Sequence, residues 1–132
     1  MPDGMEYALG SLSLFERGAY VLTINGVDYP PHVAPGFAAL LTPVFAIFGT
    51  LPHYAYYGHL VLSVALVASV MLLARRIFGE IAALVSGFAA AISGTHIQLT
   101  NIMIMSDPTG CFFIVLSCIF ALACLKDRRR ES

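Results

Sequence analysis

Three stretches of this chain are long, apolar and free of Asp, Glu, Lys and Arg: residues 54–74, 81–105 and 108–125. A helix needs roughly 20 apolar residues to cross about 30 Å of hydrocarbon, so each stretch is long enough, or nearly so, to span a bilayer. The composition agrees, because 58% of the residues are hydrophobic and 11% are charged, whereas a soluble domain carries about 25% charge. The sequence therefore predicts an all-α polytopic membrane protein, with three transmembrane helices at about 54–74, 81–105 and 107–125.

The basic residues predict how these helices are oriented. Six of the seven basic residues follow the first and third stretches, and the seventh is Arg17. Because cytoplasmic loops are enriched in Lys and Arg, we expect residues 126–132 to form a cytoplasmic basic tail and residues 1–53 to form an extracytoplasmic loop. The membrane is expected to be the plasma membrane of a prokaryote. The net charge of −1 argues against nucleic acid as a partner.

The predicted extracytoplasmic loop has local patterns of its own. Apolar residues at helical spacing predict a short helix over residues 5–17, which Gly18 ends. A β-branched run at 20–24, the Asn25-Gly26 pair and residues 27–29 predict a small hairpin. Residues 37–48 are apolar, are interrupted by Pro43 and are too short to span, so we expect a second short helix at the membrane interface.

Acidic residues stand where two of these helices are expected to begin. Asp3 and Glu6 match the spacing of a capping box, with Asp in the Ser/Thr position. Asp107 and Pro108 match an N-cap followed by Pro at the first helical position. Helix capping alone explains why acids stand at these positions. A catalytic role is compatible with capping, because a capping carboxylate can still face a reacting group.

Polar residues gather in the second half of the second stretch. His96, Gln98 and Asn101 either line a cavity at the outer side or pack against a neighbouring helix. Two Ser-Gly pairs seven residues apart, at 86–87 and 93–94, predict close packing between helices. The four histidines do not have the spacing of metal ligands, so the sequence predicts no metal site.

Several motifs occur in an order that is typical of one class of membrane enzyme. An acid opens an outer helix with a tyrosine four residues later (Asp3, Tyr7), and Gly-Ala-Tyr follows at 18–20. Then come Y-P-P-H-V-A-P-G-F-A-A-L-L-T-P over residues 29–43, A-R-R-I-F-G over 74–79 and S-D-P over 106–108. Together they resemble the membrane glycosyltransferases of family 39 and of the protein O-mannosyltransferase type, which share the GT-C architecture.

The resemblance covers nearly the whole chain and implies a fold and a reaction. The matching part of such enzymes runs from just after the first transmembrane helix to about the fourth, so the chain is expected to be a slice truncated at both ends. Its implied partners are the membrane, the remaining transmembrane helices of the full-length enzyme and a lipid-linked sugar donor. The implied reaction moves a sugar from a polyprenyl phosphate to an acceptor on the outer face, without a cofactor.

The resemblance also implies which residues act. These enzymes carry a catalytic acid in the first outer loop, often in an Asp-Glu pair, and Asp3 occupies the matching place as the base. Gly4 stands where Glu is common, which leaves Glu6 and Asp107 as supporting acids. The residues expected to contact substrate share an outer position and a polar or aromatic side chain: Tyr7, Arg17, Tyr29, His32 and His96.

Two other functions fit the same apolar chain. A small assembly subunit without catalysis, or an inactive remnant of an enzyme, has the right length, but neither needs an acid-started helix followed by a Pro-rich turn. A piece of a transporter would place polar residues deep in more than one span, whereas here they gather at one end of a single stretch.

Overall fold

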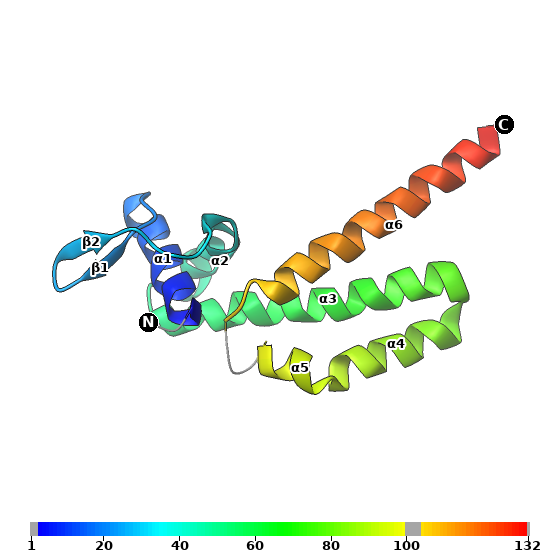
Figure 1. Ribbon diagram of the computed structural model, residues 1–132, viewed down its shortest axis with the longest axis horizontal. Coiled ribbons are helices and arrows are strands. Elements are labelled where there is room, and N and C mark those ends of the chain that lie inside the picture. Colours follow the sequence, from blue (N-terminus) through cyan, green and yellow to red (C-terminus); the bar gives the residue numbers. More distant parts are fainter. Residues whose placement is uncertain (1–2, 100–103, 132) are drawn as a thin grey trace.

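The computed structural model describes residues 3–99 and 104–131, with side chains as far as residue 125. The described chain is almost entirely helical and has two parts (Figure 1). Residues 3–54, called the head region below, contain two helices and a hairpin. The remaining helices form the stem, which runs away from the head region and carries the C-terminus at its far end.

The first helix of the head region, α1 (Asp3–Arg17), has charges that suit a helix dipole. Asp3 and Glu6 lie in its first turn and Arg17 in its last, an arrangement that stabilises both ends. Gly18 follows with φ of 66°, and its N–H donates to the carbonyl of Leu14 at 3.1 Å. The helix and its glycine stop are confirmed.

A two-stranded antiparallel hairpin follows α1. It consists of β1 (Leu22–Ile24) and β2 (Val27–Tyr29), with Thr23 opposite Asp28. Asn25 and Gly26 both have positive φ, 53° and 80°, which is the geometry of a type I′ turn. The predicted hairpin is therefore confirmed.

The second helix of the head region, α2 (Pro35–Phe48), begins two residues earlier than expected, with Pro35 in its first turn. It tolerates Pro43 in its interior and ends at Gly49, where φ is 102°. The short 3-10 helix η1 (Pro52–Tyr54) leads into the stem. The main core lies where α1, α2 and the start of the stem meet, and its buried members are Tyr7, Ala8, Phe37, Ala38, Leu41, Phe45, Ala55 and Ile104.

Among the residues that the structure describes, two helical segments are long and apolar enough to cross a membrane. The first comprises η1 and α3 (Ala55–Phe78) and spans 27 residues with a mean hydropathy of 2.1. The second is the apolar part of α6, Asp107–Leu125, with a mean hydropathy of 2.3. The helix α6 itself continues to Glu131, so the backbone of the predicted basic tail is helical as far as that residue.

The stretch predicted as the second span, residues 81–105, is not a single helix. α4 (Glu80–Ile92) ends at Ser93, where ψ is 119°, and the short α5 (Gly94–Ile97) follows. The Ser93 hydroxyl accepts a hydrogen bond from the N–H of His96 at 3.5 Å, so it caps α5. A 13-residue helix is about 20 Å long, which is less than the hydrocarbon thickness. Thr100 and Asn101 lie outside the described residues.

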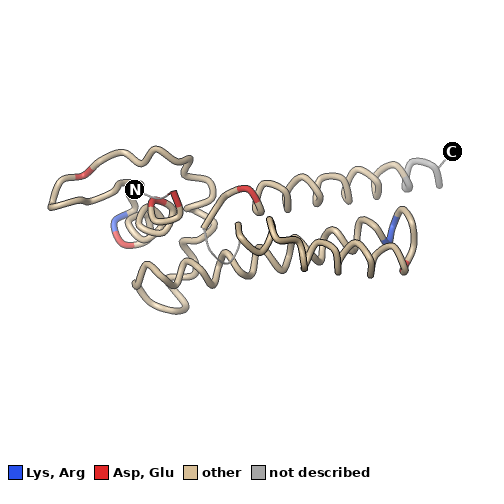
Figure 2. Tube along the Cα trace, turned by 60° about the horizontal axis from the view of Figure 1, so that its bottom comes forward, with Lys and Arg blue, Asp and Glu red and all other residues tan. Residues whose placement is uncertain are grey.

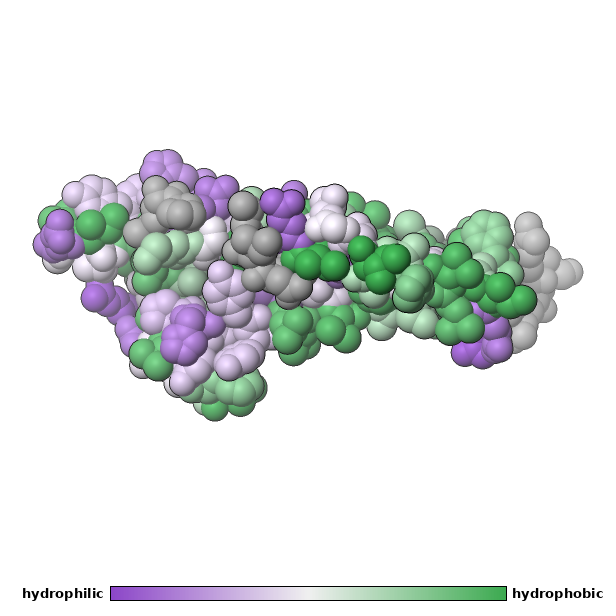
Figure 3. Space-filling view, turned by 90° about the horizontal axis from the view of Figure 1, so that it is seen from below, coloured by the Kyte–Doolittle hydropathy of each residue, from purple (hydrophilic) through white to green (hydrophobic). Residues whose placement is uncertain are grey.

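The hydropathy of the surface differs between the same two parts, the head region and the stem. Hydrophobic side chains cover most of the visible face of the stem, whereas hydrophilic patches lie mainly over the head region (Figure 3). The turn between α3 and α4, at the far end of the stem, carries an ion pair between Arg75 Nη2 and Glu80 Oε1 at 2.6 Å. The stem is thus apolar along its length and charged at this turn.

Candidate functional site

The first turn of α1 packs against the segment that leads into α6. A Cβ atom at Gly4 would lie 3.0 Å from the backbone nitrogen of Ile104. Tyr7 Oη donates a hydrogen bond to Ser106 Oγ at 3.2 Å, joining residues 99 positions apart. This contact joins the first two turns of α1, a helix that begins at Asp3, to the residue directly before α6, which begins at Asp107. Figure 2 shows most of the acidic residues over the head region and at the start of α6. We call this place the acidic junction.

Both acidic residues of the acidic junction are exposed, and each is the first residue of a helix. The Ser106 carbonyl accepts the N–H of Gly110 at 2.9 Å, so Ser106 is the N-cap of α6 and Asp107 its first helical residue. The N-cap predicted at Asp107 is therefore displaced by one residue. A carboxylate at a helix N-terminus is favoured by the helix dipole, and the exposure of Asp3 and Asp107 leaves both open to a reacting group.

The surroundings of Gly4 explain why glycine, rather than a second acid, follows Asp3. A Cβ at that position would meet the backbone nitrogen and oxygen of Ile104 at 3.0 and 3.1 Å. Contacts this short force the neighbour to move, and a backbone segment moves less easily than the end of a side chain. The close approach of α1 to Ile104 therefore favours glycine at this position over a residue with a side chain.

Glu6 holds the Pro-rich loop between the hairpin and α2. Its side chain is buried, Oε2 accepts the backbone N–H of His32 at 3.0 Å, and Oε1 lies 3.4 Å from His32 Nδ1. The His32 ring itself is exposed. Glu6 and His32, which the sequence predicted as site residues without linking them, are therefore in contact, and the Glu6 carboxylate holds the loop that carries His32 in position.

Two tyrosines make further contacts around this loop, one between α1 and α2 and one to the loop itself. The Tyr7 ring packs edge-on against Phe37, with 4.8 Å between ring centroids. Tyr20 Oη donates to the carbonyl of Val33 at 3.1 Å. Burial of Tyr20, with Tyr7 and Glu6 nearby, raises the pKa of its phenol above the usual value, so the phenol keeps its donor hydrogen.

Arg17 and Tyr29 lie away from the acidic junction. Arg17 Nη1 lies 3.4 Å from Asp28 Oδ1 and donates to Thr23 Oγ1 at 3.0 Å, so it ties the end of α1 to the hairpin. Arg17 lies fourteen positions after Asp3 on the same helix, which is about 21 Å along the axis. Tyr29 is exposed on β2. The structure does not bring these two predicted substrate contacts to Asp3.

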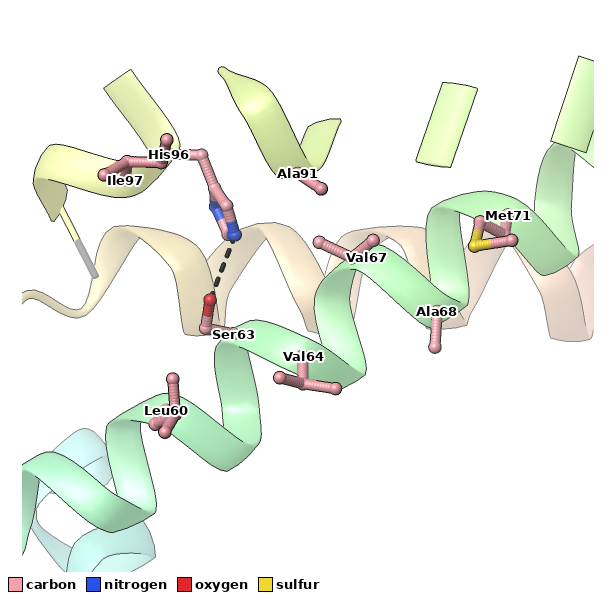
Figure 4. A pocket seen from close by; sticks show the side chains of 9 residues that line it. All are labelled: Leu60, Ser63, Val64, Val67, Ala68, Met71, Ala91, His96 and Ile97. Carbon is pink, nitrogen blue, oxygen red and sulfur yellow. Dashed lines mark hydrogen bonds between the residues drawn. The ribbon is translucent and has the colours of Figure 1, made fainter. Parts of the chain in front are cut away.

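His96 contacts α3 within the stem. Its Nε2 lies 3.0 Å from Ser63 Oγ, and one turn earlier on α3 the Nε2 of His59 lies 3.0 Å from the carbonyl of Leu99. These two hydrogen bonds hold the segment after the helix break against α3. The interpretation of His96 as a packing residue agrees with this contact, and His96 also lines a cavity of about 380 Å³ between α3 and the helices α4 and α5 (Figure 4).

Sequence reasoning missed three residues of this region. Ser106 stands directly before Asp107-Pro108, and because serine is a common N-cap residue, its capping role could have been predicted. The hydrogen bond of His59 to the Leu99 carbonyl joins residues 40 positions apart, so the adjacent sequence gave no signal of it. Tyr20 belongs to the Gly-Ala-Tyr motif, but no role was predicted for its side chain. Among the side chains that the structure describes, no three His, Cys, Asp or Glu lie close enough to hold a metal ion.

The fold and the junction together define a helical membrane protein with one acidic residue at the start of α1 in the head region and a second at the start of α6 in the apolar stem. Residues 31–132 match the family described as dolichyl-phosphate-mannose-protein mannosyltransferase. Because the match covers more than half of the chain, the chain belongs to this family, and the resemblance drawn from the motifs is confirmed. The match includes Asp107 and begins after α1, which carries Asp3. No curated protein and no solved structure matches the chain.

Proposed function

We propose that this chain contributes the base of a glycosyl transfer from a polyprenyl-phosphate sugar to an acceptor hydroxyl on the outer face of a membrane. Membership of a mannosyltransferase family supports the reaction class. The observation that carries the proposal is the acidic junction, where Tyr7 of α1 bonds to Ser106 directly before α6, so that the two helices that begin with the exposed residues Asp3 and Asp107 are joined near their starts.

The proposed chemistry needs one proton acceptor at this place. The acceptor hydroxyl gives its proton to the Asp3 carboxylate while its oxygen bonds to the anomeric carbon of the sugar. The bond between that carbon and the phosphate oxygen breaks, and the polyprenyl phosphate leaves with the electron pair. General base catalysis by a positioned carboxylate typically contributes about 10²–10⁴ in rate.

The neighbours of Asp3 are assigned supporting roles. Asp107 adds a second exposed carboxylate at the start of α6 and is the proposed supporting acid. Glu6 positions the Pro-rich loop through His32 and takes no part in proton transfer in this proposal, because its carboxylate is buried and hydrogen-bonded. The exposed ring of His32 lies on that loop and is the proposed substrate contact there.

The charge distribution supports an outer position for the head region. The described head region holds four acids against the single basic residue Arg17, whereas Arg75 and Arg76 end α3 at the far end of the stem. The positive-inside rule then places the α3–α4 turn in the cytoplasm and the acidic junction outside.

The base assignment is tested by Asp3→Asn in the membrane-embedded enzyme. We expect sugar transfer from a polyprenyl-phosphate donor to fall by about 10² or more, because the amide cannot take a proton. Glu16→Gln is the matched control, since it makes the same change at an exposed position near the other end of α1. The control should transfer at the wild-type rate, and wild-type transfer by Asp3→Asn would overturn the assignment.

The membrane side is tested separately with single cysteines in a chain whose own three cysteines are replaced by serine. Thr23→Cys in the hairpin should react with a membrane-impermeant maleimide in intact cells. Glu80→Cys at the α3–α4 turn should react only after the cells are opened. The reverse pattern would place the head region in the cytoplasm.

A further inference from the structure

The tyrosine of the Gly-Ala-Tyr motif folds back onto the helix that precedes it. Gly18, with φ of 66°, ends α1 and lets the chain turn, and the Tyr20 ring then lies against the middle of α1. A Cβ atom at Gly10 would be 2.5 Å from Cε2 of that ring and 3.3 Å from Cζ, so a side chain at this position would push the ring away. Glycine destabilises a helix interior relative to alanine, and the close approach of Tyr20 accounts for it here.

The hydroxyl end of Tyr20 reaches the Pro-rich loop. Its Oη donates a hydrogen bond to the Val33 carbonyl at 3.1 Å, and both residues are partly buried against the main core. One residue earlier, Glu6 Oε2 accepts the His32 N–H at 3.0 Å. Side chains therefore hold two consecutive residues of the loop, the first through its N–H and the second through its carbonyl.

These two hydrogen bonds hold the backbone on both sides of the His32 side chain. The His32 ring itself is 90% exposed, so it is open to a molecule that approaches from solvent. A side chain on a fixed backbone loses less conformational freedom on binding than one on a free loop. The loop therefore presents the imidazole in a preorganised position.

The loop is held beside the proposed base. Asp3 and Glu6 lie three positions apart in the first turn of α1, and residues with this spacing are neighbours on a helix surface. Glu6 is buried, whereas Asp3 is exposed. The residue that holds the His32 N–H is thus the neighbour of Asp3 on α1.

We propose that Tyr20 is a positioning residue for the glycosyl transfer. Packed against Gly10 and bonded to Val33, it fixes the backbone that presents His32 to the substrate. The inference rests on the proposed function, in which Asp3 is the base and His32 contacts the substrate. Tyr20 touches no reacting group and acts through the loop.

The effect of Tyr20 on the loop is tested without measuring activity, by hydrogen exchange of the full chain in detergent micelles. Tyr20→Phe keeps the ring and removes the hydroxyl. Exchange in the peptide that covers residues 29–34 should become about three- to tenfold faster, the effect of one lost hydrogen bond. Tyr56→Phe is the matched control, because Tyr56 is an exposed tyrosine of the stem, and it should leave this peptide unchanged. Wild-type exchange in Tyr20→Phe would overturn the proposal.

Gly10→Ala tests the same contact from the side of the helix. The added methyl group takes the place of the ring edge, so the ring must move and its hydroxyl is drawn away from Val33. Exchange in the loop should rise as it does in Tyr20→Phe. Gly36→Ala is the control, since a Cβ there would meet no described atom beyond its own helix within 4 Å. A Gly10→Ala loop that exchanges like the wild type would show that the ring does not depend on α1, against the proposal.

Sugar transfer tests the positioning role. In the membrane-embedded enzyme, Tyr20→Phe should raise KM by about three- to tenfold and leave kcat within about twofold, because the loop binds substrate less well while Asp3 is unchanged. In a His32→Ala chain, Tyr20→Phe should not raise KM further, because the residue through which it acts is gone. The proposal is overturned by a wild-type KM in Tyr20→Phe, or by an equal rise in KM with and without His32.

Asp3→Asn separates the failure of this proposal from the failure of the proposed function. Its loop should exchange like the wild type while its sugar transfer is lost. Wild-type transfer by Asp3→Asn would overturn the base, and the exchange and KM results would still decide the role of Tyr20. Loss of transfer in Asp3→Asn together with a wild-type KM in Tyr20→Phe would overturn the positioning role and leave the base supported.

Discussion

The head region and the stem bury different kinds of side chain. In the head region, Phe37, Leu41 and Phe45 are 6%, 0% and 2% exposed. In the stem, Phe78 is 78% exposed and Ile81 is 81% exposed. The buried positions of the stem are mainly small or polar, and they include Ala55, Ser63, Ser69, Ala83, Gly87 and Thr109.

This difference follows from the solvent that each region meets. Burial of large apolar side chains away from water drives the packing of the head region. Lipid tails are as apolar as Leu or Phe, so helices in a bilayer gain little by burying such residues and associate through close contact and hydrogen bonds instead. The comparison teaches that one short chain follows two packing rules, and each rule can be tested by substitution.

The largest expected effect is loss of a buried aromatic ring in the head region. Phe45→Ala should lower the free energy of unfolding by about 3–5 kcal/mol, because it leaves a cavity in a core that is 2% exposed at this residue. Phe88→Ala is the stem counterpart, and its ring is 67% exposed, so we expect a change of about 0.5 kcal/mol or less. Denaturant titration in detergent micelles measures both, and equal losses would contradict the comparison.

A glycine contact should dominate the stability of the stem. A Cβ at Gly87 would collide with the side chain of Met71 on α3, so Gly87→Leu should cost about 1–3 kcal/mol through overpacking. A Cβ at Gly110 on α6 would meet no described atom of another element within 4 Å, and Gly110→Ala should instead stabilise the helix by about 0.5–1 kcal/mol. Unfolding of both variants in the same micelles decides the point. A Gly87→Leu chain as stable as the wild type would mean that α3 and α4 do not pack closely.

The polar contact in the stem is expected to contribute less. A double-mutant cycle with Ser63→Ala and His96→Ala isolates their mutual interaction from any other contact of either residue. We expect a coupling energy of about 0.6 kcal/mol, the average for hydrogen bonds between membrane helices. A coupling energy of zero would mean that the two side chains do not interact in the micelle.

The smallest effect is expected on the surface of the head region. Arg17 and Asp28 are each about half exposed, at 53% and 52%, so Arg17→Gln should cost at most about 0.5 kcal/mol. The cost should disappear at about 1 M salt, where charges are screened within roughly 3 Å. Unfolding titrations at low and high salt measure this, and a loss that salt leaves unchanged would point to packing rather than charge.

Local elements were predictable from the sequence because their causes are local. The apolar spacing and Gly18 predicted α1, and Asn25-Gly26 predicted the hairpin, since both depend on a few adjacent residues. The break at Ser93 was missed because a stretch without charged residues was interpreted as one span, although polar residues begin at Ser93, where the serine caps a new helix. Ser93-Gly94 was expected to pack against a neighbour, as Gly87 does, and it ends a helix instead.

The candidate site was predictable only in part. Asp3, Tyr7 and Asp107 were singled out from their positions in the motifs, and the structure brings their segments together. The pairing of Glu6 with His32 depends on how a Pro-rich loop folds back over α1, whereas the separation of Arg17 from Asp3 follows from the length of α1 itself. No rule of periodicity or spacing describes such a loop.

The sequence by itself determined that this chain is helical and apolar enough for a membrane, where its local elements lie, and to which family it belongs. These properties depend on composition, periodicity and adjacent residues, which can be read along the chain. Only the tertiary structure decided that Tyr7 meets Ser106, that Glu6 holds His32, and that a cavity opens beside Ser63. Such contacts join residues far apart in the chain, and they depend on how whole helices pack in space.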